Sequence, residues 1–93
     1  MEKNSSNSPN DSSVEELFGK VLQQLRKEKG LSQEMLGFES GYHRTYISLL
    51  ERGKKSPSLK TIFQLAKALN VEPSDLMDRM QKLGAHFSRK NQF

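Results

Sequence analysis

The sequence predicts an all-α fold of five helices, and two observations lead to this fold class. In several segments apolar residues recur every three or four positions, which is the spacing of one face of an α-helix. No segment shows the alternation of apolar and polar residues that is typical of a β-strand. The length of 93 residues and the hydrophobic content of 33% fit one small domain. We expect this domain at residues 14–83, between a disordered Ser- and Asn-rich arm at 1–13 and a flexible basic tail at 84–93.

The first helix is expected to begin at Val14 and to end before Gly30. A capping box can start it, formed by Ser12 with Glu15 or by Ser13 with Glu16. Its apolar stripe consists of Val14, Leu17, Phe18, Val21, Leu22 and Leu25. Gly19 lies inside this helix at a cost of about 1 kcal/mol relative to alanine, and the pattern offers no reason for it.

Two short helices are expected to follow. Ser32 can cap the first of them and Gly41 can end it, while the second begins near Arg44 and is closed by Gly53. Its inward-facing residues are Ile47 and Leu50.

The last two helices are separated by a short connection at Asn70 and Val71. Ser58 can cap the fourth helix, and Pro73 suits the first position of the fifth. The apolar positions of the fourth helix are Leu59, Ile62, Phe63, Leu65, Ala66 and Leu69, and those of the fifth are Leu76, Met77, Met80 and Leu83.

Positive charge is concentrated in one segment of the chain. The net charge is +4, and residues 26–60 hold eight Lys or Arg against four Asp or Glu, an excess equal to that of the whole chain. Such a concentration favours a polyanionic partner such as nucleic acid, although a solvated basic face would show the same charge. The chain has no cysteine and no apolar run near the length of a membrane span. We therefore expect a soluble cytoplasmic protein.

The two short helices and the turn between them lie inside this basic segment, which predicts a helix-turn-helix. In such a unit the second helix enters the major groove of DNA, where donors and acceptors distinguish the base pairs. Gly41 can adopt the positive φ that the turn needs. Gly37 is small enough to let the two helices cross closely.

Residues 25–76 resemble the Cro/lambda-repressor-like (Xre-type) helix-turn-helix domains. The resemblance is carried by LSQ at 31–33, Gly41, YIS at 46–48, ERG at 51–53, PSL at 57–59 and LAKAL at 65–69. It implies a sequence-specific transcriptional regulator, of bacterial, phage or plasmid origin, that binds a palindromic DNA operator as a dimer. A repressor, an antitoxin-like autoregulator or a restriction-modification controller would all fit.

The resemblance also implies roles for individual residues at the start of each short helix. Gln33 matches a glutamine that anchors a DNA phosphate, and its alternative is an ordinary surface residue. Arg44 and Thr45 match positions that face base edges; an arginine here can bind guanine with two hydrogen bonds, or contact phosphate alone. His43 takes the cap position and is expected to meet the DNA backbone. Tyr46 is expected either to reach a phosphate with its hydroxyl or to pack its ring against the preceding helix.

Further positions complete the expected interface. Leu49 lies one turn beyond Thr45, where it would contact a thymine methyl group or be shielded by another helix. Lys54 and Lys55 follow Gly53 and would clamp phosphates. Arg26 and Glu51 match a structural salt bridge of the family.

Two groups of apolar residues could serve a binding partner as well as the fold of the monomer. Met35 and Phe38 stand where the family is more often polar, so they either pack under the arm or the tail, or form a protein-binding patch. A protein-binding adaptor is therefore the alternative function. The apolar stripe of the fifth helix is expected to close the core in part and to form the seam of a dimer; it consists of Leu76, Met77, Met80 and Leu83.

The sequence favours neither an enzyme nor a metalloprotein. No nucleophile-histidine set, phosphate-binding glycine loop or metal cluster can be assembled from it. His43 has no credible metal-binding partner, because the other histidine is His86 near the C-terminus. We expect no cofactor and no metal.

Overall fold

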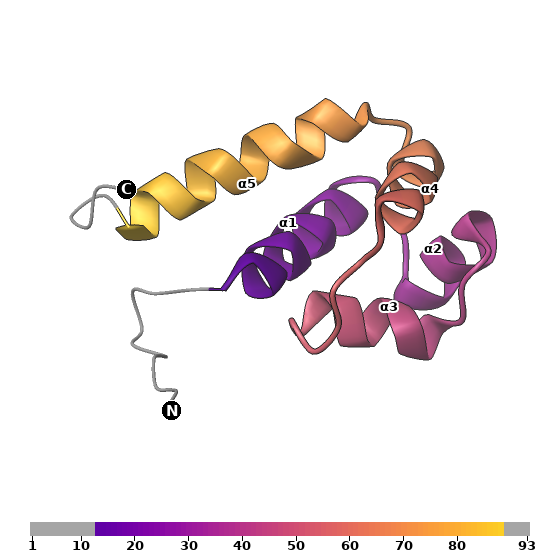
Figure 1. Ribbon diagram of the computed structural model, residues 1–93. Coiled ribbons are helices and arrows are strands. Elements are labelled where there is room, and N and C mark those ends of the chain that lie inside the picture. Colours follow the sequence, from indigo (N-terminus) through magenta and orange to yellow (C-terminus); the bar gives the residue numbers. More distant parts are fainter. Residues whose placement is uncertain (1–12, 89–93) are drawn as a thin grey trace.

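The computed structural model describes residues 13–88, which form five α-helices (Figure 1). Their bounds are α1 Val14–Glu28, α2 Gln33–Ser40, α3 Arg44–Glu51, α4 Leu59–Leu69 and α5 Pro73–Ser88. The all-α class with five helices is confirmed. The arm at 1–12 and the last residues of the tail, 89–93, lie outside the described residues. No helix in the described part of the chain is both long and apolar enough to cross a membrane.

The helix boundaries follow the capping residues. Ser13 and Glu16 form the capping box of α1: the Glu16 N–H donates to Ser13 Oγ at 3.1 Å, and the Ser13 N–H donates to Glu16 Oε1 at 3.2 Å. Ser32 and Ser58 cap α2 and α4 in the predicted way. At the other end of the chain α5 runs past Leu83 to Ser88. Residues 84–88 are therefore helical, where the sequence was interpreted as the start of a loose tail.

The core lies where the apolar stripes of the five helices meet. Its fully buried residues are Phe18, Val21, Leu22, Leu25, Leu36, Ile47, Leu50, Leu65, Ala66, Leu69 and Leu76. Leu76 is thus a core residue, and its assignment to a dimer seam is wrong because none of its surface is accessible. Met80 and Leu83 are half-buried against this core, and Met77 remains 43% exposed.

Two apolar positions of α4 do not face the core. Leu59 and Phe63 belong to the apolar positions of the sequence pattern, yet they are 76% and 60% exposed. The stripe that packs inward consists of Leu65, Ala66 and Leu69, with Ile62 beside them. Leu59 and Phe63 are separated by one turn, so they lie together on an outer face of α4.

Close approach of backbones explains two glycines inside helices. A Cβ at Gly19 of α1 would lie 2.5 Å from the carbonyl oxygens of Leu50 and Glu51 at the end of α3. A Cβ at Gly37 of α2 would collide with the carbonyl oxygen of Tyr42 in the turn. The prediction for Gly37 is confirmed, and Gly19, which the sequence left unexplained, lets α1 cross α3.

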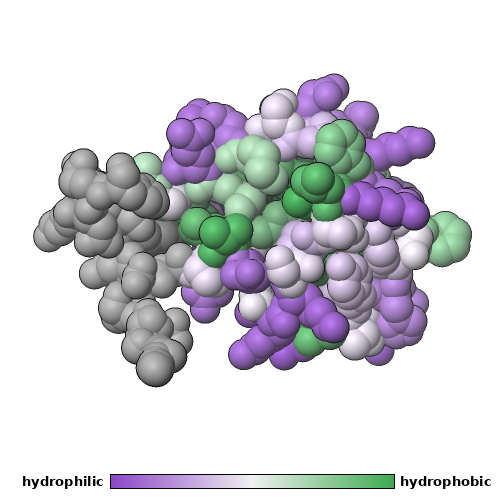
Figure 2. Space-filling model, viewed as in Figure 1, coloured by the Kyte–Doolittle hydropathy of each residue, from purple (hydrophilic) through white to green (hydrophobic). Residues whose placement is uncertain are grey.

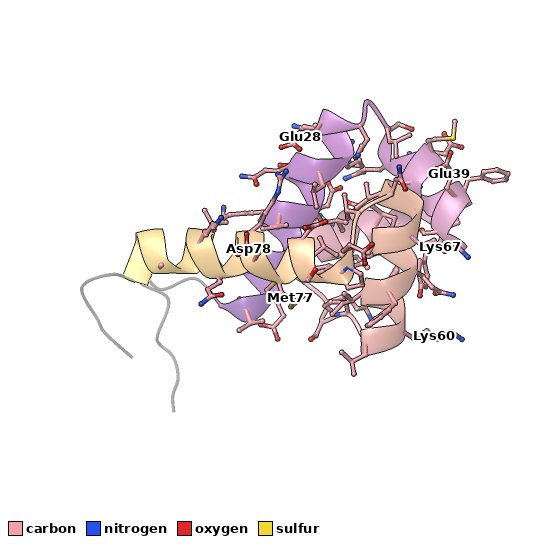
Figure 3. All side chains as sticks on the ribbon, turned by 90° about the horizontal axis from the view of Figure 1, so that it is seen from above. Glu28, Glu39, Lys60, Lys67, Met77 and Asp78 are labelled. Atoms are coloured by element: carbon pink, nitrogen blue, oxygen red, sulfur yellow. The ribbon has the colours of Figure 1, made fainter. Side chains whose placement is uncertain are left out.

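Helices α5 and α3 pack on α1, and α4 joins α2 to α5 (Figure 1). A bidentate ion pair ties the middle of α5 to the end of α1: Arg79 donates to Glu28 from Nη1 at 2.8 Å and from Nη2 at 3.0 Å. Figure 3 shows Glu28 at this end of α1. The hydrogen bonds from Arg79 lower the pKa of Glu28 below its ordinary value.

Candidate nucleic-acid interface

The turn between α2 and α3 is held in one conformation. Gly41 adopts φ 85°, in the left-handed region that a side chain would disfavour. The N–H of the next residue, Tyr42, donates to the carbonyl oxygen of Gly37 at 2.8 Å. Ser40 is buried, and its hydroxyl donates to the Leu36 carbonyl oxygen at 2.7 Å. Two helices joined by this tight turn form a helix-turn-helix unit.

His43 caps α3 through its imidazole ring. Its Nδ1 accepts a hydrogen bond from the Thr45 N–H at 3.0 Å. This contact requires Nδ1 to be unprotonated, so in the neutral ring Nε2 carries the hydrogen. The side chain is exposed, and its Nε2–H remains a donor for an acceptor outside the protein.

The first two residues of α3 present their side chains to solvent. Arg44 and Thr45 are exposed, while Ile47 and Leu50 on the opposite side of the helix are fully buried. The core therefore fixes which face of α3 points outward. Leu49 is half-buried, so part of its side chain is accessible next to this face.

A pair of tyrosines fixes the turn against α4. The ring of Tyr46 packs on that of Tyr42 with 5.1 Å between centroids. The Tyr42 hydroxyl shares a hydrogen bond of 2.9 Å with Thr61 Oγ1 and donates to Gln64 Oε1. Tyr46 thus packs against the turn that follows α2, and its ring is half-buried.

Glu51, the last residue of α3, accepts hydrogen bonds from side chains of two other helices, α1 and α2. Its Oε2 accepts from Arg26 Nε at 2.6 Å, and its Oε1 accepts from Arg26 Nη2 and from Gln33 Nε2, each at 3.0 Å. Arg26 also donates from Nη1 to the Leu31 carbonyl oxygen at 2.8 Å. The Glu51 side chain is 1% exposed. The ion pair expected between Arg26 and Glu51 is therefore present, and the same carboxylate orients the amide of Gln33.

One residue of this group was missed by the sequence interpretation. Gln23 on α1 donates from Nε2 to Glu51 Oε1 at 3.4 Å, and its side chain is exposed. The signal available in the sequence was its spacing: Gln23 stands three residues before Arg26, and this places both on one helical face.

Among residues 13–88, the other predicted residues make no hydrogen bond or ion pair with Glu51. Lys54 and Lys55 are exposed in the loop that begins at Gly53, beyond the end of α3. Met35 and Phe38 are exposed on α2, and Phe38 is 82% exposed. Among residues 13–88, no three His, Asp or Glu side chains come together in a way that could hold a metal ion.

A second exposed apolar surface, besides Met35 and Phe38 on α2, lies away from α3. Figure 2, in the view of Figure 1, shows apolar side chains exposed where α5, α1 and α4 meet. Among the residues of these helices whose side chains the structure describes, the exposed large apolar ones are Val14, Leu59, Phe63 and Met77. In Figure 3, seen from above, Met77 is labelled on α5, and Lys60 and Lys67 on α4.

Residues 22–76 match the family described as helix-turn-helix. The chain belongs to this family. It is 51% identical over 63 residues to the control protein C.BamHI of Bacillus amyloliquefaciens, a match that covers 67% of this chain and 78% of the relative. The crystal structure of the restriction-modification controller protein C.AhdI from Aeromonas hydrophila is 48% identical, with a TM-score of 0.66 over 67% of this chain and 94% of that one.

The controller protein C.Esp1396I is similar in structure, with a TM-score of 0.71 and 30% identity over 77% of this chain and 95% of that one. Solved structures also include variants of C.Esp1396I in which an arginine, the threonine after it, or the tyrosine after that is replaced. The same three residue types open α3 in the same order, as Arg44, Thr45 and Tyr46.

Proposed function

We propose that this helix-turn-helix protein is a sequence-specific DNA-binding transcriptional regulator of the restriction-modification controller type. The observation that carries the proposal is the first turn of α3, where Arg44 and Thr45 are exposed on a helix whose opposite face is fixed in the core. A helix held in this way can enter the major groove and present the same side chains to the bases every time. In this role the protein acts in the cytoplasm and catalyses no reaction.

In this proposal Arg44 reads a guanine, since a guanidinium can donate to O6 and N7 together for about 1–3 kcal/mol of discrimination. Thr45 and the accessible part of Leu49 lie beside it. The backbone of the duplex is held by Gln33, by the Nε2–H of His43 and by the two loop lysines, Lys54 and Lys55. Tyr46 supports the start of α3 through its packing on Tyr42.

The comparisons support this assignment. C.BamHI, C.AhdI and C.Esp1396I are control or controller proteins by name. Arg, Thr and Tyr, each replaced in a variant of C.Esp1396I, occur in the same order at the start of α3, where Arg44 and Thr45 are exposed. A regulator of this kind accounts for the excess of positive charge in residues 26–60.

We also propose that the protein binds DNA as a homodimer on a palindromic operator. One helix-turn-helix reads few base pairs, and a twofold axis places two copies of α3 about 34 Å apart, which is one turn of DNA. The seam consists of Met77, Met80 and Leu83 on α5, together with Leu59 and Phe63 on α4. The arm at 1–12 is a poor cover for this surface, because Met1 is its one apolar residue.

Selection of bound fragments from a random pool of duplex DNA tests the function. We expect a palindromic site to be enriched, with half-sites about one helical turn apart. Arg44→Ala should weaken binding to that site by about tenfold or more and relax the choice of base at one position of each half-site. Lys20→Ala, on an exposed position of α1, is the matched control. A pool that enriches no sequence would contradict the proposal.

The second candidate is an adaptor that binds protein through α2. The observation in its favour is Phe38, which projects from α2 with 82% of its surface exposed, beside the half-exposed Met35. Singly exposed apolar side chains are common, so the DNA-binding function is preferred. If Phe38→Ser abolished regulation in the cell while DNA affinity stayed unchanged, the protein contact would be the one that matters.

A further inference from the structure

We propose that Gln23 of α1 is a DNA-contacting residue that donates its side-chain amide to a backbone phosphate beside Gln33. This inference rests on the proposed function, since it adds a residue to the same interface. The helix-turn-helix consists of α2 and α3. With Gln23, α1 would also contact the duplex directly.

The two glutamine amides are neighbours because they share one acceptor. Gln33 Nε2 lies 3.0 Å and Gln23 Nε2 lies 3.4 Å from the same oxygen, Oε1 of Glu51. Each amide has two N–H groups, and within residues 13–88 neither amide donates to a second acceptor. Each glutamine therefore has a second N–H that can donate to a ligand, and the two N–H groups lie at the same place on the surface.

The charge of Glu51 does not repel an anion from this place. Its carboxylate is almost completely buried, and Arg26 donates to both of its oxygens. What faces solvent is therefore a pair of amides, which can donate to a phosphate without the cost of desolvating a charge.

The two glutamines differ in how firmly they are held. Gln33 is half-buried and its hydrogen bond has a normal length, so its amide is fixed. Gln23 is exposed and its hydrogen bond is long, so its amide can turn toward a phosphate at little cost. Gln33 serves as the fixed donor and Gln23 as the adjustable one.

The test uses Gln23→Met, which keeps the length of the side chain and removes the amide. Its matched control is Gln24→Met, the next residue of α1, which is also exposed. Affinity is measured for the selected operator and for a scrambled duplex over a range of salt concentrations, with a thermal melt of each variant to confirm folding. We expect Gln23→Met to weaken binding to both duplexes by about a hundredfold, because loss of a hydrogen bond to a charged group costs about tenfold in each half of a dimer. Gln24→Met should bind as the wild type does.

The salt dependence separates the role of an amide from that of a lysine. An amide releases no counterion, so Gln23→Met should lower affinity by the same factor at every salt concentration. Lys54→Ala should instead reduce the slope of log affinity against log salt by about one for each phosphate that the lysine neutralised.

A second comparison separates direct contact from positioning of Gln33. In a Gln33→Ala background, Gln23→Met should still weaken binding by several fold. If it has no further effect there, or if Gln23→Met alone binds as the wild type does, the inference is overturned. If the wild-type chain binds no duplex, the proposed function itself fails.

Discussion

Replacing Gly19 by alanine should destabilise the fold, although alanine is the better helix former. The substitution gains about 1 kcal/mol of helix propensity. Against this, the new Cβ would lie 2.5 Å from two carbonyl oxygens at the end of α3, and relieving the clash requires α1 and α3 to separate by most of an ångström. Overpacking of this kind costs about 1–3 kcal/mol, and the separation also disturbs the buried pair of Arg26 and Glu51. We expect a net loss of about 2 kcal/mol.

For a domain of this size, such a loss lowers the midpoint of thermal unfolding by about 10 °C. Circular dichroism during heating and during urea titration measures it, with Lys20→Ala as a control for an exposed position of the same helix. Lys20→Ala should stay within about 0.5 kcal/mol of the wild type. A Gly19→Ala protein as stable as the wild type would show that α1 and α3 do not approach as closely as described.

Three further outcomes follow from the packing and the ion pairs. Arg26→Met should lower the free energy of unfolding in urea by about 3 kcal/mol, because it leaves the Glu51 carboxylate buried without its counter-charge; an unchanged unfolding midpoint would contradict this. Phe63→Glu should convert the proposed dimer to a monomer in sedimentation equilibrium, whereas an unaltered mass would remove α4 from the seam. Arg79 lowers the pKa of Glu28, so the stability that this pair supplies is present near pH 7 and is lost as the pH falls through the lowered pKa. The melting midpoints of the wild type and Arg79→Gln should therefore differ at pH 7 and converge in acid, and a constant difference would refute the assignment.

Local signals in the sequence predicted the helices because each boundary depends on a few neighbouring residues. Each of the capping serines accepts a hydrogen bond from a backbone N–H in the first turn of the helix that it caps; these serines are Ser13, Ser32 and Ser58. Gly41 adopts the left-handed conformation that the turn after α2 requires. These interactions span three or four residues, so a pattern can capture them.

What the sequence could not supply depends on how separate helices cross. Periodicity marks Leu76 and Phe63 alike as apolar positions, but it does not say which neighbour covers them; Leu76 meets the core, and Phe63 projects from the outer face of α4. The reason for Gly19 lies in the end of α3, which is distant in the chain. The same holds for Gln23 and Gln33, which both donate to the carboxylate of Glu51. They meet there because α1 crosses α3 at Glu51, the last residue of α3.

This crossing makes one side chain, that of Glu51, serve both the stability of the fold and the proposed DNA contact. Glu51 closes the interface of α1 with α3 through Arg26, and its Oε1 also orients the amide expected to hold a phosphate. A change that separates the two helices should therefore move Gln33 away from the duplex while α3 still carries Arg44 outward. In Gly19→Ala, DNA affinity should fall at temperatures where the protein is still fully folded, and the loss should be equal for operator and scrambled DNA, because a phosphate contact carries no sequence information. A loss of affinity confined to the operator would instead mean that the separation of α1 from α3 had displaced the start of α3. In that case Gly37 and the turn would not hold the start of α3 independently of α1.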